Sequence, residues 1–87
     1  MKLIISARAE KQLRKIPKFD QLAISQKIRN LPKLNLLTAE KLSGFPNIYR
    51  VRVGNYRIVY KKTEDSLFII LIRHRRDVYR LVKELLG

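Results

Sequence analysis

Three arginines on two short neighbouring segments could together bind a phosphate. Arg50 and Arg52 alternate with apolar residues, and Arg57 follows them across Gly54-Asn55. That dipeptide is typical of a two-residue hairpin turn, which would make Arg52 and Arg57 cross-strand partners. Partnered residues project to the same face of a sheet, and so do residues two apart on one strand. We therefore predict that the three guanidinium groups converge on one face.

Arginine opposite arginine weakens a sheet, because like charges repel across a strand pair. The solvated outer face of an antiparallel sheet could still carry such residues through polar-out alternation alone. An anionic ligand explains three arginines better, since a planar guanidinium matches two phosphate oxygens at once. We expect this face to bind phosphate groups.

A second group of cations lies near the end of the chain. Residues 73–80 read RHRRDVYR and lead from a predicted strand into a predicted helix. Strand alternation places Arg73 and Arg75 on one face and His74 on the other. The phenol of Tyr79 could stack on a nucleobase, or it could be a half-buried surface aromatic. The run therefore extends the candidate nucleic-acid site into the last helix.

Two residues of this run suggest chemistry, but the pattern favours a structural role for both. His74 is the only histidine, and its ordinary pKa would suit a general base near neutral pH. Its position opposite Arg73 and Arg75 favours a structural hydrogen bond at the strand end. Asp77 is best explained as a favourable negative charge at a helix N-terminus.

The sequence holds no residue pattern for metal, disulfide or phosphate-loop chemistry. It has one histidine, seven Asp and Glu residues that are scattered along the chain, and no cysteine. No ligand pair therefore sits at metal-binding spacing, and no glycine-rich phosphate loop occurs. We expect an enzyme built from these residues to need no metal or cofactor and to act through cations placed where negative charge develops.

The net charge indicates an anionic partner. Twenty Lys and Arg residues against seven Asp and Glu give +13, beyond the magnitude of about 2–8 that serves solubility in a small domain. Nucleic acid, an anionic membrane and an acidic protein are the candidate partners. Lysine dominates among the basic residues up to position 47 and arginine after it. The first half thus predicts general attraction, and the second half predicts phosphate binding in a defined geometry.

Hydrophobic periodicity predicts the elements that position these residues. Residues 2–5 are a strand candidate, and Ser6 can cap a helix that Pro17 ends. A second helix is expected from near Phe19-Asp20 to Pro32. The remaining elements are a connecting region at 33–47, strands at 49–53, 56–61 and 67–72, and an amphipathic helix over 78–86. The strand at 67–72 is wholly apolar, which predicts burial on both faces.

These elements describe one α+β domain spanning residues 1–87, with the order β-α-α-β-β-β-α. We expect an antiparallel sheet meander packed by an N-terminal αα-hairpin and a C-terminal helix. The longest apolar run has six residues, far short of the roughly 20 that span a bilayer. No signal peptide is evident, so we expect a cytoplasmic protein without membrane contact.

Three segments in combination resemble the RelE toxins of the RelE/ParE superfamily. They are KLSGFP at 41–46, YRVRVGNYRIVY at 49–60 and RHRRDVY at 73–79. The resemblance covers the whole chain in length, element order and charge, and it implies a RelE-like fold. It also implies a type II toxin that enters the ribosomal A site and cleaves the mRNA codon there. In that reaction the 2′-OH attacks the adjacent phosphate and expels the 5′-oxygen, without a metal.

The resemblance also implies roles for particular residues. Its catalytic basic residues fall at Arg50, Arg52, Arg57 and Arg75, and its functional tyrosine falls at Tyr79. We expect Arg57 and Arg75 to contact the phosphate, the other two arginines to add positive field, and the tyrosine to stack on a base or take a proton. The residues expected to contact RNA outside the catalytic set are Arg50, Arg73, Arg76, Arg80 and Lys41.

This chain departs from the best-known RelE toxins at two of these positions. Those proteins carry lysine where this chain has Arg50 and Arg52. A lysine can lose its proton when its pKa is depressed, whereas arginine effectively cannot. A general-base role of lysine therefore does not transfer, and Tyr79 and His74 are the candidates for taking the 2′-OH proton.

Two other functions fit the same features in part. ParE-like toxins share the fold and poison DNA gyrase by binding, although that branch generally lacks the arginine set with the C-terminal tyrosine. A basic RNA-binding module without catalysis would explain the charge alone.

A protein partner follows from the resemblance. RelE toxins are neutralised by a cognate acidic antitoxin of the RelB kind, which wraps the toxin and represses the operon jointly with it. Such a toxin meets DNA only indirectly, through the toxin–antitoxin complex. A charge of +13 suits an acidic segment that folds on binding.

Overall fold

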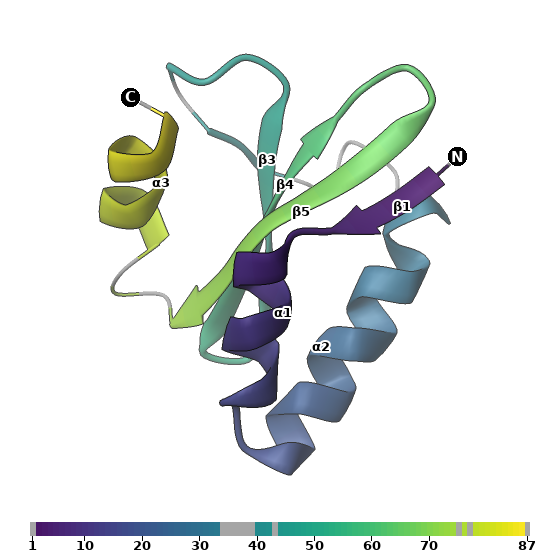
Figure 1. Ribbon diagram of the computed structural model, residues 1–87, viewed down its shortest axis with the longest axis vertical. Helices are drawn as coiled ribbons and strands as arrows, with labels where there is room; N and C mark the ends of the chain where they lie inside the picture. The colour runs from purple at the N-terminus through teal and green to yellow at the C-terminus, as the bar shows by residue number, and fades with distance from the viewer. Residues whose placement is uncertain (1, 34–39, 43, 75, 77, 87) are drawn as a thin grey trace.

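The computed structural model describes residues 2–33, 40–42, 44–74, 76 and 78–86. In this part of the chain a sheet has two helices on one face and a third helix beside the other (Figure 1). The elements are β1 (Lys2–Ile5), α1 (Ala7–Arg14), α2 (Lys18–Asn30), the 3-10 turn η1 (Leu31–Lys33), β2 (Glu40–Lys41), β3 (Ile48–Val53), β4 (Tyr56–Lys62), β5 (Ser66–His74) and α3 (Val78–Leu86). The α+β class and the predicted order of the main elements are confirmed.

The five strands lie in the order β1-β5-β4-β3-β2. Strands β3, β4 and β5 form the predicted antiparallel meander. The two-residue strand β2 pairs antiparallel with β3; it lies inside the segment predicted only as a connection. Strand β1 pairs parallel with β5, so the sheet is mixed rather than purely antiparallel. A parallel neighbour requires a long crossover between the two strands, and the α1–α2 hairpin with the rest of the chain up to β5 supplies it.

Local capping fixes the start of the helical hairpin. The Ser6 hydroxyl oxygen accepts the backbone N–H of Ala9 at 3.0 Å, as the sequence predicted for an N-cap. Pro17 stands directly before α2, whose first residue is Lys18 rather than the predicted Phe19 or Asp20. Proline is tolerated here because N–H groups at the start of a helix have no intrahelical acceptor, so the N–H that proline lacks is not missed.

Helix α1 takes over hydrogen bonding along β5 where β1 ends. The backbone N–H of Ser6 donates to Ile69 O at 3.0 Å, and the Ser6 hydroxyl donates to Ile70 O at 2.9 Å. Further along, the side-chain oxygen of Gln12 accepts the backbone N–H of Ile72 at 2.8 Å. Side chains thereby satisfy backbone groups that a neighbouring strand would otherwise pair.

The sheet separates two apolar clusters. On one face Ile24 and Ile28 of α2 and Ala9 of α1 pack against the strands. On the other face Val82 of α3 packs against a smaller group, whose strand members are Ile48, Val59 and Leu71. The helix that the C-terminal periodicity predicted is therefore present and buries Val82 completely.

Two apolar side chains are more exposed than the sequence predicted. Phe68 on β5 is 39% exposed, although the run at 67–72 was expected to be buried on both faces. It pairs in register with Lys61, which is itself exposed. Leu85 is 40% exposed, so the short helix α3 leaves part of its own apolar stripe uncovered.

The predicted hairpin turn is present at Gly54, and a second glycine also has a positive φ. Gly54 adopts φ +60° in the hairpin that joins β3 to β4, and Gly44 adopts φ +83°. Both values lie in the left-handed region that glycine enters without a Cβ clash. Among the described residues, no helix has the length and apolar character needed to cross a membrane.

The contact between Gln12 and Ile72 gives a stability prediction. Ile72 is fully buried, so Gln12→Ala leaves its N–H without a partner, and we expect the free energy of unfolding to fall by about 1–3 kcal/mol. Gln26→Ala, at an exposed position of α2, is the matched control and should change little. Urea denaturation of both variants checks this, and equal loss in the two would show that the Gln12 hydrogen bond contributes nothing.

Candidate nucleic-acid interface

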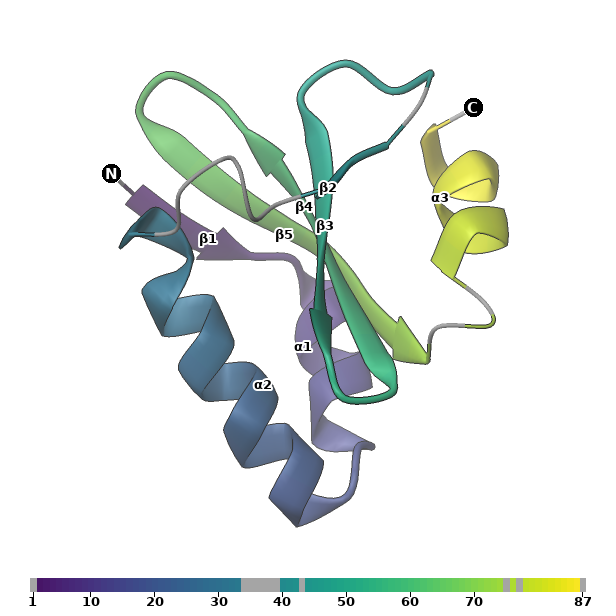
Figure 2. The same ribbon diagram turned by 180° about the vertical axis from the view of Figure 1, so that it is seen from behind.

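Three arginines from consecutive strands lie in one row across the sheet. Arg52 of β3 pairs with Arg57 of β4, as the hairpin turn predicted. Arg57 in turn pairs with Arg73 of β5. Neighbouring strands are about 4.8 Å apart, so this set, here called the arginine row, spans roughly 10 Å. Figure 2 shows the β3–β4 hairpin and the end of β5 together at the lower edge of the sheet.

The arginine row lies on the sheet face that α3 covers in part. Alternation along each strand places Arg52 on the face of Ile48, Arg57 on that of Val59, and Arg73 on that of Leu71. Those three apolar residues belong to the cluster that packs against α3. Arg50 shares this face, two residues before Arg52. The row therefore continues the α3 face beyond its apolar part, toward the hairpin turn.

Backbone contacts hold two guanidinium groups of the row near the turn. The Nε–H of Arg52 donates to Gly54 O at 3.2 Å, and Nη1 of Arg57 makes a longer contact of 3.5 Å with Tyr56 O. Arg52 is exposed, whereas Arg57 and Arg73 are half-buried. Cations that the protein holds in place before a charge develops stabilise it without reorganisation.

Other predicted RNA contacts lie near the row or apart from it. Arg76 and Arg80 are exposed, at the entry to α3 and within it. Lys41 pairs in register with Tyr49, which places it on the sheet face that α1 and α2 cover. The structure therefore does not bring it to the arginine row. Arg75 lies outside the described residues, as does Asp77. Tyr79 belongs to the first turn of α3, and its side chain also lies outside the described part.

His74 lies on the face opposite the arginine row, as alternation predicted. It pairs in register with Tyr56, and the two rings meet edge to face with centroids 5.9 Å apart. Its Nδ1 accepts the backbone N–H of Arg76 at 3.4 Å, a structural hydrogen bond at the strand end. This geometry separates the histidine from the face that carries the arginine row.

A pair of tyrosines also belongs to the sheet face that α1 and α2 cover. The rings of Tyr49 and Tyr60 stack with centroids 5.7 Å apart and an interplanar angle of 24°. Tyr60 is buried, and this burial, with a smaller effect of Tyr49, raises the pKa of its phenol above the ordinary value of 10.0. Both rings serve packing rather than the arginine row.

The donor set for a metal is not gathered in the described part of the chain. Among these residues, no three His, Asp or Glu side chains come together. The chemistry that the site offers is positive charge on a sheet face, with an aromatic residue in the adjoining helix.

Comparison with known proteins assigns the fold to a family. Residues 3–79 match the family model described as ParE toxin of type II toxin-antitoxin system. Toxin RelE3 of Methanocaldococcus jannaschii is 31% identical over 84 residues, which cover 91% of this chain and 96% of the relative. The chain belongs to the RelE/ParE superfamily of type II toxins.

Solved structures of this superfamily share the fold. The toxin in the RelB-RelE antitoxin-toxin complex from Methanococcus jannaschii superposes with a TM-score of 0.72 at 28% identity, over 87% of this chain and 94% of that one. The isolated Escherichia coli RelE toxin gives 0.69 at 26% identity over 98% of both chains. The ParDE system of Pseudomonas aeruginosa gives 0.65 at 15% identity, over 85% and 95%. The last likeness concerns the fold alone.

The raised pKa of Tyr60 gives a prediction at alkaline pH. The folded state keeps this phenol protonated above the pH at which the unfolded chain ionises, so stability is fully present below about pH 10 and is lost as pH rises toward the folded pKa. Between about pH 9 and about pH 11, the wild type should lose more unfolding free energy than Tyr60→Phe, in which only lysines and the other tyrosines titrate. Urea denaturation across this range checks it, and parallel stability curves would contradict the assignment.

Proposed function

We propose that this superfamily member is a ribosome-dependent endoribonuclease, an mRNA interferase that cuts the codon in the ribosomal A site and so inhibits translation. Residues 1–87 would act as one toxin domain in the cytoplasm, without a metal or cofactor. The observation that carries the proposal is the register that aligns Arg52, Arg57 and Arg73 on one sheet face.

The proposed reaction is an internal transfer at one phosphate. The 2′-oxygen of the mRNA forms a bond to the adjacent phosphorus, the bond to the 5′-oxygen breaks, and the leaving oxygen takes up a proton. Negative charge spreads over the phosphate oxygens as this happens. Arg57, at the centre of the row, would contact the phosphate, with Arg52 and Arg50 adding positive field on one side. We assign Arg75 a phosphate contact as well, from its place after β5.

The proton of the 2′-OH needs an acceptor. Arginine does not supply one, because it stays protonated in proteins. Of the two other candidates, His74 lies on the opposite sheet face and is engaged at Nδ1. We therefore assign proton transfer to Tyr79, in the first turn of α3: its phenolate would accept the 2′-OH proton, and the resulting phenol would return a proton to the leaving 5′-oxygen. Arg76, Arg80 and Arg73 would bind the RNA on either side of the reacting group.

An acidic antitoxin is the proposed protein partner. The M. jannaschii relative was solved as a RelB-RelE complex, and the E. coli relative as the intact RelBE complex. A net charge of +13 and the exposed Leu85 of α3 suit an acidic helical segment that buries apolar side chains on binding. DNA would be met only through that complex.

Replacement of Arg57 tests the site directly. Arg57→Ala should lower the rate of mRNA cleavage by about 10²–10³-fold, because one preorganised cation is lost from the developing charge. Arg29→Ala removes an equal charge from an exposed position of α2 and should cut at the wild-type rate. Primer extension on mRNA in purified translating ribosomes measures both, with free mRNA as the test of ribosome dependence.

The outcome that overturns this assignment is specific. Wild-type cleavage by a folded Arg57→Ala variant would show that the arginine row takes no part in the reaction. Equal cleavage of free and ribosome-bound mRNA would leave an endoribonuclease but remove its dependence on the ribosome.

Two substitutions at Tyr79 separate stacking from proton transfer. Tyr79→Phe keeps an aromatic face but cannot accept a proton, so we expect single-turnover cleavage on the ribosome to fall by about 10²–10⁴-fold. Tyr79→Ala should fall at least as far. Full activity of the phenylalanine variant, with loss only in the alanine variant, would assign the residue to stacking alone.

The matching family model is the reason to test a second function, inhibition of DNA gyrase. Its description names a ParE toxin of the parDE system, and a ParE-like toxin would inhibit DNA gyrase by binding. A supercoiling assay with purified gyrase distinguishes the two functions. Inhibition of supercoiling by Arg57→Ala as well as by wild type, without mRNA cleavage by either, would favour the gyrase function.

A further inference from the structure

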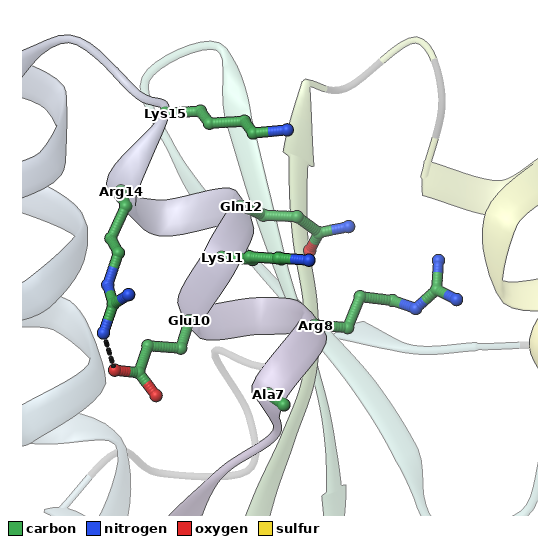
Figure 3. A pocket seen from close by; sticks show the side chains of 7 residues that line it. All are labelled: Ala7, Arg8, Glu10, Lys11, Gln12, Arg14 and Lys15. Atoms are coloured by element: carbon green, nitrogen blue, oxygen red, sulfur yellow. Dashed lines mark hydrogen bonds and ion pairs between the residues drawn. The ribbon is translucent and has the colours of Figure 1, made fainter.

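One side of α1 carries a line of cations away from the arginine row. Arg8, Lys11 and Lys15 follow one another at helical spacings of three and four residues, which puts them on one side. Figure 3 shows their side chains extending from α1 on the side away from Arg14 and Glu10. They border a hollow of about 610 Å³ along the helix. We call these three residues the α1 ridge.

The α1 ridge places like charges next to each other, and the carboxylate that lines the same hollow, Glu10, is paired elsewhere. Glu10 pairs with Arg14 at 2.6 Å on the other side of the helix. Within the described residues the structure gives no ion pair to any member of the ridge. Like charges three or four residues apart destabilise a helix, so an anion bound along the ridge would relieve their repulsion.

A smaller pocket adjoins the ridge at the end of β5. It measures about 210 Å³, and the rings of Tyr56 and His74 line it together with Arg73, over the buried Ile72. Lys15 and Gln12 line both this pocket and the hollow along α1. The two concavities therefore adjoin each other at these two residues. The volume lies below the roughly 300–1,000 Å³ of pockets for drug-sized ligands, which suits one planar group.

The pocket offers aromatic faces and oriented hydrogen-bond groups. Tyr56 and His74 meet edge to face. In this arrangement the two rings do not stack on each other, so a ring face remains that a nucleobase can contact. Gln12 uses its side-chain oxygen for the Ile72 N–H at 2.8 Å. This contact holds the amide in place, and among the described residues its NH₂ group has no hydrogen-bond partner. A nucleobase combines the ring face and the acceptor atoms that such a site would bind.

We propose that this chain has a second RNA contact, in which one nucleobase occupies the pocket of Tyr56, His74 and Gln12 while the α1 ridge binds the neighbouring phosphates. Arg73 connects it to the first site, because it belongs to the arginine row and also lines the pocket. A strand with one phosphate on the row can thus pass around the end of β5 with the next nucleotide entering the pocket. The proposal takes RNA as the ligand from the proposed function, but it requires no cleavage.

The test uses an RNA that the protein cannot cut. The probe is a fluorescein-labelled single-stranded oligonucleotide with every 2′-OH methylated, and binding is measured by anisotropy at several salt concentrations. Lys15→Ala should lower the slope of log affinity against log salt by about 0.7, the value for one phosphate contact on a single strand. Lys2→Ala, at an exposed position of β1, is the matched control and should leave the slope unchanged.

Variants at His74 test the base pocket separately from charge. His74→Ala should weaken binding on the order of 10-fold, because a stacking face is lost, with the salt slope unchanged. His74→Phe restores an aromatic face and should bind as tightly as wild type, which guards against a folding defect. The proposal is overturned if Lys15→Ala behaves as Lys2→Ala, or if the alanine and phenylalanine variants at 74 bind alike.

A polyglutamate peptide distinguishes an acidic protein from RNA as the ligand. Competition by this peptide that is lost in Lys15→Ala, with no effect of His74→Ala on RNA binding, would reduce the ridge to a general acid-binding surface and overturn the base pocket. If the wild type does not cleave mRNA but the Lys15 and His74 variants change RNA binding as expected, the proposed function is contradicted and the base pocket is supported.

Discussion

The register of three antiparallel strands is the constraint on which the site depends. It places Arg52, Arg57 and Arg73 directly beside one another, an arrangement that like-charge repulsion disfavours. That repulsion is the reason for proposing an anion that lies over all three. A shift of any one strand by one residue would turn its arginine to the other face and break the row.

The rest of the fold keeps that register in place. Strand β1 pairs with only the first part of β5. Beyond it, Ser6 and Gln12 supply hydrogen bonds to β5 as far as Ile72, one residue before Arg73. The larger apolar cluster packs under α1 and α2, on the face away from the row. His74 and the stacked pair of Tyr49 and Tyr60 lie on this same face. The opposite face carries the arginine row and the short helix α3.

The sequence predicted the part of this arrangement that short-range geometry determines. Gly54-Asn55 sets the hairpin, so the pairing of Arg52 with Arg57 followed from turn length alone. The pairing of Arg57 with Arg73 did not, because a register shift between Val59 and Tyr60 adds an offset that alternation does not reveal. Lys41 was expected near the RNA, but the face it occupies depends on the two-residue strand β2, which is too short to leave a periodic signal. Exposure of Phe68 likewise depends on how far α3 reaches, and composition does not show that.

A double-mutant cycle between Arg52 and Arg57 tests most directly whether the row acts as one phosphate site. The rate of ribosome-dependent mRNA cleavage is measured for Arg52→Ala, Arg57→Ala and the double variant. Side chains that act on the same phosphate give strongly non-additive effects, so we expect the double variant to be little slower than the slower single variant. A double variant slowed by the full product of the two single effects would contradict a shared phosphate and show two independent contacts.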